Sequence, residues 1–185
     1  MSANAERRVT PRPVRELQRR ASNPAASAWV SANAGSGKTH VLVQRVLRLL
    51  LDGAPPSAIL CLTFTKAAAA NMSARVFKRL ANWTALDDEA LKREIEETGA
   101  PADGAAHLSL ARRLFARTIE TPGGLKIQTI HAFCERLLHL FPFEANVAAG
   151  FRVAEERESA LLMEEARARR AAGDPRGRGR SRFPV

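Results

Sequence analysis

Residues 32–39, AlaAsnAlaGlySerGlyLysThr, combine side chains and glycines that can hold a phosphate group. Gly35 and Gly37 allow a tight turn that presents backbone N–H groups to phosphate oxygens. Lys38 adds a positive charge for the outer phosphates, and Thr39 adds a hydroxyl for Mg²⁺. The pattern is that of a P-loop with alanine in place of its first glycine. It predicts a binding site for a nucleoside triphosphate.

A P-loop requires a strand before it and a helix after it, because the helix N-terminus directs its dipole at the phosphates. The apolar run 28–32 predicts a buried strand, and residues 38–51 have the apolar spacing of a helix. Runs 59–64 and 125–129 predict two further short strands, the first of them buried. Helical periodicity recurs over 14–22, 67–83, 107–119, 130–140 and 155–170. This alternation predicts an α/β fold with a parallel sheet.

The acidic stretch 84–106 interrupts this alternation. Its composition predicts a surface excursion, with one short helix and a loop.

Two short polar segments directly follow predicted strands. One is Thr63-Phe64-Thr65-Lys66, and the other is 129–134 with His131. In open α/β sheets ligands bind beyond the carboxyl ends of the strands, and hydroxyls, a lysine and an aromatic ring suit a phosphate backbone and a stacked base. The alternative for the first segment is a threonine helix cap with a core phenylalanine. For His131 it is a hydrogen-bonded structural residue.

Arg45 lies seven residues after Lys38. Seven residues are nearly two helical turns, so the two side chains share a helix face. Arg45 is therefore either directed back towards the nucleotide or a solvated surface arginine.

The net charge of +10 and a pI of about 11.1 indicate a polyanionic partner, either nucleic acid or an acidic membrane surface. About half of the surplus lies in 167–182, where seven arginines accompany one acid. The sequence has no apolar run of membrane-spanning length and no apolar leader. Cys61 and Cys134 lack the spacing of a metal site, so we expect reduced, buried thiols in a cytoplasmic protein without a membrane partner.

Taken together, the motifs resemble superfamily 1 DNA helicases of the UvrD/Rep type. Residues 32–39 match that family's AxAGSGKT motif, 63–72 are similar to TFTNKAAxEM, and 129–134 match TxHxxC. The second motif departs from the pattern, because Ala67 stands where a lysine is usual and Asn71 where an acid is usual. The resemblance implies a RecA-like parallel sheet with flanking helices, ATP and Mg²⁺ as cofactors, and single-stranded DNA or duplex ends as partner.

The resemblance also implies roles for individual residues. Gln18, upstream of the P-loop, is expected to recognise adenine, and Arg45 to help hold the nucleotide. The implied nucleotide site comprises Gln18, Asn33, Ala34, Gly35, Ser36, Gly37, Lys38, Thr39 and Arg45. Within it, Lys38 and Thr39 are the expected catalytic groups, and Thr39 the Mg²⁺ ligand. The implied DNA contacts are Thr63, Phe64, Thr65, Lys66, Thr129 and His131.

Within that superfamily, segments 31–39, 62–70 and 151–158 look most like AddA-type helicase–nuclease subunits of double-strand break repair, which implies an AddB-like second subunit. The family's Asp-Glu pair, which holds Mg²⁺ and activates water, has no counterpart at a strand end here. We therefore expect an incomplete P-loop NTPase domain, the front piece of a longer helicase, which binds ATP but does not unwind DNA alone.

The expected organisation has four parts. A basic flexible tail occupies 1–13, and the first part of a RecA-like domain occupies 14–150. The helical start of a further segment follows at 151–172, and a disordered Arg/Gly/Pro tail, interpreted as a frame-shifted terminus, occupies 173–185.

Two other functions compete with this interpretation. A small P-loop kinase would transfer phosphate from ATP to a small acceptor. A non-catalytic, basic nucleic-acid-binding fragment would bind in a salt-dependent manner that neither ATP nor the loss of Lys38 affects. A GTPase is disfavoured because the sequence has no NKxD segment to recognise guanine.

Overall fold

A computed structural model describes residues 11–172 other than 34, 103, 149 and 155. The chain divides after Phe133 into two units. The first contains α1 (Arg12–Ala21), α2 (Lys38–Leu51), the 3-10 turn η1 (Pro56–Ala58), β1 (Leu60–Thr63), α3 (Lys66–Ala85), α4 (Asp88–Thr98), α5 (Gly104–Glu120) and β2 (Lys126–Thr129). Helix α6 (Ile130–Leu140) crosses the division, and α7 (Glu156–Ala171) belongs to the second unit.

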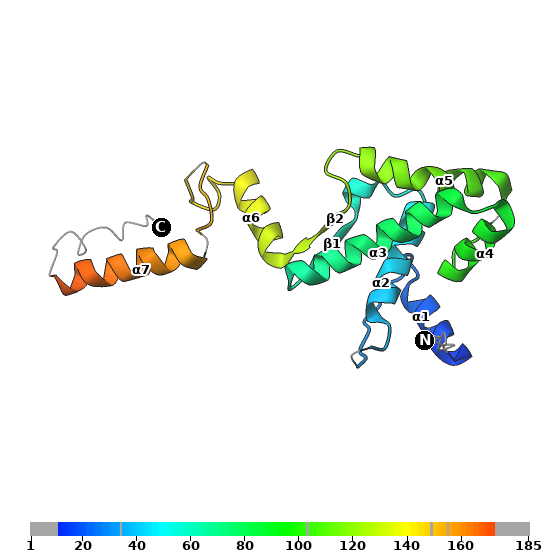
Figure 1. Ribbon diagram of the computed structural model, residues 1–185, viewed down its shortest axis with the longest axis horizontal. Helices are drawn as coiled ribbons and strands as arrows, with labels where there is room; N and C mark the ends of the chain where they lie inside the picture. Colours follow the sequence, from blue (N-terminus) through cyan, green and yellow to red (C-terminus); the bar gives the residue numbers. More distant parts are fainter. Residues whose placement is uncertain (1–10, 34, 103, 149, 155, 173–185) are drawn as a thin grey trace, which may run out of the picture. The chain divides into compact units, whose positions relative to one another are not determined.

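The two strands form one parallel pair, in which Leu60 lies opposite Lys126 and Thr63 opposite Thr129. Helices α3, α4 and α5 connect them, and α3 packs against both strands (Figure 1). Each strand runs directly into a helix, so the starts of α3 and α6 lie at the same edge of the sheet. The described part of the chain is thus rich in helix with a small parallel sheet, in agreement with an α/β class.

The hydrophobic core lies where α2 meets α3, α4 and α5. Met72, Val76, Leu80 and Trp83 form one stripe of α3, and the last three are fully buried. Leu47 contributes a fully buried side chain from α2. Burying a side chain of this size typically stabilises a fold by about 1.5–3 kcal/mol, so this contact fixes how α2 sits on α3.

The acidic stretch after α3 packs more closely than its composition predicts. Asp87 caps the start of α4, because its side chain accepts a 2.7 Å hydrogen bond from the backbone N–H of Ala90. Leu91 and Ile95, one turn apart, are fully buried in the core. The prediction of a surface excursion is therefore wrong for this helix, because Leu91 and Ile95 share one buried face while most of its charged residues are exposed.

The predicted buried strand over 28–32 is also wrong. These residues have no regular secondary structure, and the Trp29 side chain is 96% exposed. An apolar run becomes a strand only when a neighbouring strand takes up its backbone hydrogen bonds. In the described residues β1 and β2 pair with each other, and neither pairs with 28–32.

The strand over 60–63, expected to be buried, is half-exposed instead. Leu60 and Leu62 are each 43% exposed. The prediction of buried thiols holds only in part, since Cys61 is half-buried and Cys134 is exposed. Burial raises the pKa of the Cys61 thiol.

In the second unit, local contacts hold the segment after α6. The His139 ring stacks on Phe151 with centroids 4.4 Å apart, and Arg152 donates a 2.8 Å hydrogen bond to Glu158 of α7. None of the helices described is long and apolar enough to span a bilayer. The basic tails proposed at the two ends fall mostly or wholly outside the described residues.

The core contact of α2 generates a stability prediction. Leu47→Ala is expected to lower the free energy of unfolding by about 2–5 kcal/mol, because it leaves a cavity between α2 and α3. Leu42→Ala, the same change at a 49% exposed position of the same helix, is expected to cost roughly 1 kcal/mol. Urea unfolding followed by circular dichroism measures both. Equal losses would contradict the assigned core.

Candidate functional site

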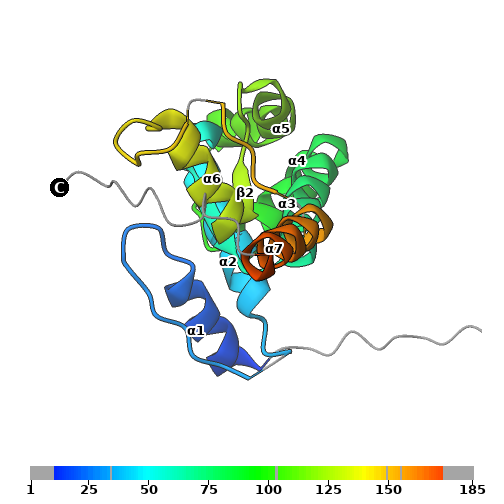
Figure 2. The same cartoon turned by 90° about the vertical axis from the view of Figure 1, so that its left-hand side faces the viewer.

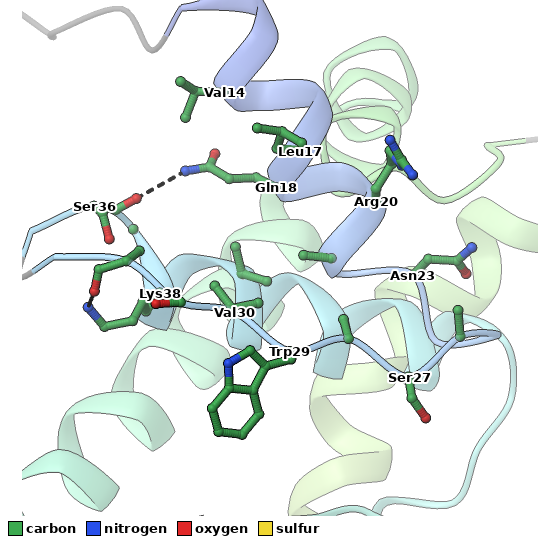
Figure 3. Close-up of a pocket in the computed structure, with 17 residues that line it drawn as sticks. Val14, Leu17, Gln18, Arg20, Asn23, Ser27, Trp29, Val30, Ser36 and Lys38 are labelled. Carbon is green, nitrogen blue, oxygen red and sulfur yellow. Dashed lines mark hydrogen bonds between the residues drawn. The ribbon is translucent and has the colours of Figure 1, made fainter.

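A pocket of about 670 Å³ lies between α1, residues 23–32 and the P-loop. After α1 the chain turns back and runs beside that helix to the start of α2 (Figure 2). Gln18 of α1 therefore faces Ser36 and Lys38 of the P-loop across the pocket (Figure 3). Pockets of this volume commonly hold small-molecule ligands.

The P-loop is a tight turn closed on its own backbone. The carbonyl oxygen of Asn33 accepts hydrogen bonds from the backbone N–H of Ser36 at 3.3 Å and from its hydroxyl at 2.7 Å. Gly35 and Gly37 have φ of 79° and 94°, a region that side chains with a Cβ rarely adopt. The two glycines are thus required by the backbone, as the motif predicts. Ala34 lies outside the described residues.

Lys38 is held over this turn. Its ammonium donates hydrogen bonds to the carbonyl oxygens of Ala32 at 2.5 Å and Asn33 at 2.7 Å. These two bonds hold the ammonium against the backbone of the turn. The next residue, Thr39, is exposed in the first turn of α2.

The site fits a nucleotide better than it fits an isolated metal ion. Backbone N–H groups of the glycine turn, the Lys38 ammonium and the N-terminus of α2 are all suited to phosphate oxygens. Among the described residues no group of three or more His, Cys, Asp or Glu side chains could hold a metal. Mg²⁺ would therefore depend on phosphate oxygens and the Thr39 hydroxyl, which is consistent with how this ion binds alongside nucleotides.

Gln18 contacts the P-loop directly. Its amide nitrogen Nε2 lies 3.4 Å from the carbonyl oxygen of Ser36. A Cβ atom added to Gly37 would lie 2.8 Å from the same nitrogen. The structure thus brings together a glutamine and a phosphate-binding turn that are 18 positions apart in the sequence.

Arg45 holds the segment that joins α1 to the P-loop. Its guanidinium donates to the carbonyl oxygens of Asn23 at 2.7 Å and Ala26 at 2.9 Å, with longer contacts of 3.4 Å to those of Ala21 and Pro24. The alternative of a solvated surface arginine is therefore wrong. A direct contact of Arg45 with a nucleotide stays a prediction, whereas its role in holding the segment after α1 follows from these bonds.

The predicted DNA contacts lie together at the carboxyl edge of the sheet and do not line the pocket beside the P-loop. Thr65 caps α3 by accepting from Ala68 N–H at 3.1 Å, and Thr129 caps α6 by accepting from Ala132 N–H at 3.2 Å. The Thr63 hydroxyl donates to the Thr65 carbonyl at 3.0 Å.

The other side chains at this edge are open to solvent. Phe64 is 86% exposed, which rules out the alternative of a core phenylalanine. Lys66 and His131 are exposed as well. An aromatic ring, a lysine and an imidazole therefore remain available to a partner at one edge of the sheet.

Sequence reasoning missed two groups of residues. Asn23 and residues 26–32 line the pocket beside the P-loop, although the only sequence signal was their position between Gln18 and the P-loop. A second pocket, between α2, α3 and α4, contains His40 and Arg79. Its residues come from three separate helices, so no single motif could indicate it.

The chain is similar to known proteins over most of its length. The UvrD/REP helicase N-terminal domain family matches residues 14–178. Three curated relatives, all named as subunits of an ATP-dependent helicase/nuclease, come from Desulforudis audaxviator, Limosilactobacillus fermentum and Lactobacillus acidophilus. They are 40% identical over 139 residues, 37% over 147 and 33% over 138, each covering 74% of this chain. The chain spans 9–10% of the length of these relatives.

The close approach of Gln18 to Gly37 can be tested with two matched substitutions. Gly37→Ala and Gly53→Ala both place a Cβ at a φ near 90°, at 94° and 88°, and each is expected to cost about 1–2 kcal/mol of stability. Only the first new Cβ meets Gln18, because the position at Gly53 is open. Gly37→Ala is therefore expected to weaken binding of a fluorescent ATP analogue about tenfold or more, and Gly53→Ala to leave it unchanged. Equal binding by both variants would argue against a shared Gln18–P-loop site.

Proposed function

Because the chain belongs to the UvrD/REP helicase family, we propose that it binds ATP with Mg²⁺ and forms the nucleotide-binding part of an ATP-driven DNA motor. The observation that carries this proposal is the approach of Gln18 to the P-loop across one pocket. An adenine-recognising amide and a phosphate-binding turn on the same pocket suit the two ends of an adenine nucleotide.

In this proposal each part of the pocket has its own task. The Gln18 amide, which can both donate and accept, pairs with the edge of adenine. The turn at Gly35 and Gly37 and the N-terminus of α2 receive the phosphates, and Lys38 neutralises part of their charge. Thr39 offers its hydroxyl to Mg²⁺. Arg45 keeps the segment after α1 in place and so maintains the distance between the adenine end and the phosphate end.

The proposal extends to DNA at the carboxyl edge of the sheet. The exposed ring of Phe64 is suited to stacking on a DNA base. Lys66 and His131, at the starts of α3 and α6, are suited to contacting the DNA backbone. Support comes from the register of β1 and β2, which brings the two loops to one edge. In a complete RecA-like domain, ATP binding at the P-loop would alter how the loops after β1 and β2 hold the DNA strand.

The activity of the longer protein is also a proposal, because the chain spans about a tenth of its relatives. The helicase/nuclease name of those relatives supports a role in DNA repair beside a second, AddB-like subunit, in the cytoplasm, where bacterial DNA is found. The 185-residue chain by itself is proposed to bind nucleotide without unwinding DNA, since neither strand that the structure describes ends in an Asp-Glu pair that could activate water.

Nucleotide binding is tested by Lys38→Ala in the full chain. Removing a charge that bonds phosphate oxygens is expected to weaken binding of a fluorescent ATP analogue with Mg²⁺ by roughly 10- to 150-fold, the equivalent of about 1.5–3 kcal/mol. Lys92→Ala, an exposed lysine of α4, is the control and is expected to bind like wild type. Binding that survives Lys38→Ala would overturn the P-loop proposal, and transfer of phosphate to a small acceptor would favour a kinase.

DNA binding is tested by Phe64→Ala. Loss of one stacked base is expected to weaken binding of a fluorescent single-stranded oligonucleotide by about 1–3 kcal/mol at fixed salt. Phe143→Ala removes a ring that is similarly exposed, at 83% against 86%, in the second unit, and it is expected to have no effect. Fluorescence anisotropy measures both. An equal response of the two variants would show that Phe64 has no special role.

A further inference from the structure

A second pocket, of about 610 Å³, lies where α2, α3 and α4 meet. Its lining residues are His40, Val43, Gln44, Arg75, Lys78, Arg79, Asn82 and Glu94. None of them lines the pocket beside the P-loop. The two cavities therefore use different residues, even though both include side chains of α2.

The charge of this pocket is predominantly positive. Three cationic side chains, Arg75, Lys78 and Arg79, face one carboxylate, Glu94. Arg79 and Glu94 form an ion pair of 3.1 Å, so the excess charge resides on Arg75 and Lys78, which are exposed. An anion is the ligand that such a lining attracts.

A buried amide adds a second requirement. Gln44 is only 6% exposed, and its oxygen Oε1 has no hydrogen-bond partner, although its nitrogen lies 3.3 Å from the His40 ring. A buried acceptor without a donor typically costs about 1–3 kcal/mol. Arg79 Nε is likewise buried without a hydrogen-bond partner, and Arg79 Nη2 and Glu94 Oε2 have only their mutual ion pair. The pocket therefore offers unused acceptors and unused donors beside a positive surface.

These observations restrict the ligand. A fully ionised oxyanion such as sulfate would meet the positive charge, but it has no donor for the Gln44 oxygen. A nucleotide unit supplies both groups, since its phosphate accepts and a base amino group donates. An acidic peptide offers a similar pair through carboxylates and backbone N–H groups. The DNA substrate proposed above favours the nucleotide, and to that extent the choice rests on the proposed function.

We propose that the pocket between α2, α3 and α4 binds one nucleotide unit of a single-stranded nucleic acid. The phosphate lies against Arg75, Lys78 and Arg79, and a base amino group donates to Gln44. Bound there, the strand has a contact with the chain that is separate from the one at Phe64. The contact also couples nucleic acid to α2, the helix that carries the P-loop.

The environment of His40 is consistent with this ligand. Partial burial of the ring is the main reason that the pKa of His40 is lowered, and the positive charges of Arg79 and Arg75 lower it further against the opposing effect of Glu97. A phosphate group brought into the pocket would offset those positive charges and raise the pKa of His40. The imidazole is therefore a reporter for occupancy of the pocket.

The test uses the full chain and a fluorescent single-stranded oligodeoxyadenylate. Arg75→Gln with Lys78→Gln is compared with Lys92→Gln with Arg93→Gln, which removes the same charge from exposed positions of α4 outside the pocket. The first pair is expected to reduce the slope of log affinity against log salt by about 1.4, and the second to leave it nearly unchanged. Gln44→Leu is expected to weaken binding roughly tenfold without changing the slope.

His40 is followed by NMR titration in wild type and in both double variants. With the oligonucleotide added, the pKa of His40 is expected to rise in wild type and in the α4 control but not in Arg75→Gln with Lys78→Gln. If both double variants lose affinity equally, the effect is net charge alone and the pocket is excluded. If polyglutamate raises the pKa of His40 and displaces the oligonucleotide from the pocket, the ligand is an acidic peptide and the proposal is overturned.

The result for the pocket between α2, α3 and α4 can be distinguished from the results that test the proposed function. ATP-analogue binding and its dependence on Lys38 are measured in the same variants, and Phe64→Ala reports DNA bound at the sheet edge. DNA binding that depends on Phe64 but not on Gln44, Arg75 or Lys78 would overturn the second contact and leave the proposed function intact. Failure of wild type to bind the oligonucleotide would overturn this second contact and the DNA-binding part of the proposed function, whereas ATP binding is decided by the Lys38→Ala measurement.

Discussion

Burial of the apolar face of α2 against α3 is the constraint on which the rest of the first unit depends. The side chain of Leu47 is inaccessible to solvent, and it lies on the same helix whose N-terminus receives the P-loop. A single helix therefore serves both as a core element and as the support of the phosphate-binding turn. Its packing also positions Arg45 for the segment after α1 and places His40 and Gln44 against α3.

Cationic side chains satisfy backbone groups that a sheet would otherwise satisfy. Residues 22–33 run without a strand partner in the described part of the chain. Their carbonyl oxygens bond to Arg45 near the start of the segment and to Lys38 near its end. Unpaired backbone groups are costly when they lose water, so these two cations hold a segment that hydrophobic burial leaves largely exposed. Both depend in turn on the placement of α2.

Local patterns predicted the helices and both strands of the sheet well. The spacing of apolar residues gave 38–51 and 130–140 with the bounds found for α2 and α6, since periodicity and flanking glycine or proline residues are local signals. Local patterns could not show that residues 28–32 form no strand, because strand formation requires hydrogen bonds to a partner strand that is distant in the sequence. The phosphate-binding turn was predictable from its glycines and lysine. The carbonyl contacts of Arg45 and the pocket around Gln44 depend on how helices cross, which one helix's sequence does not specify.

The two tryptophans of the chain occupy opposite extremes of environment. Trp29 is 96% exposed and lines the pocket beside the P-loop, whereas Trp83 is fully buried among α3 and its neighbours. Indole emission shifts to shorter wavelength as the ring leaves water, so the two residues contribute spectrally distinct components. The native chain therefore carries its own pair of optical probes, one for the state of the pocket beside the P-loop and one for the integrity of the core, without any added label.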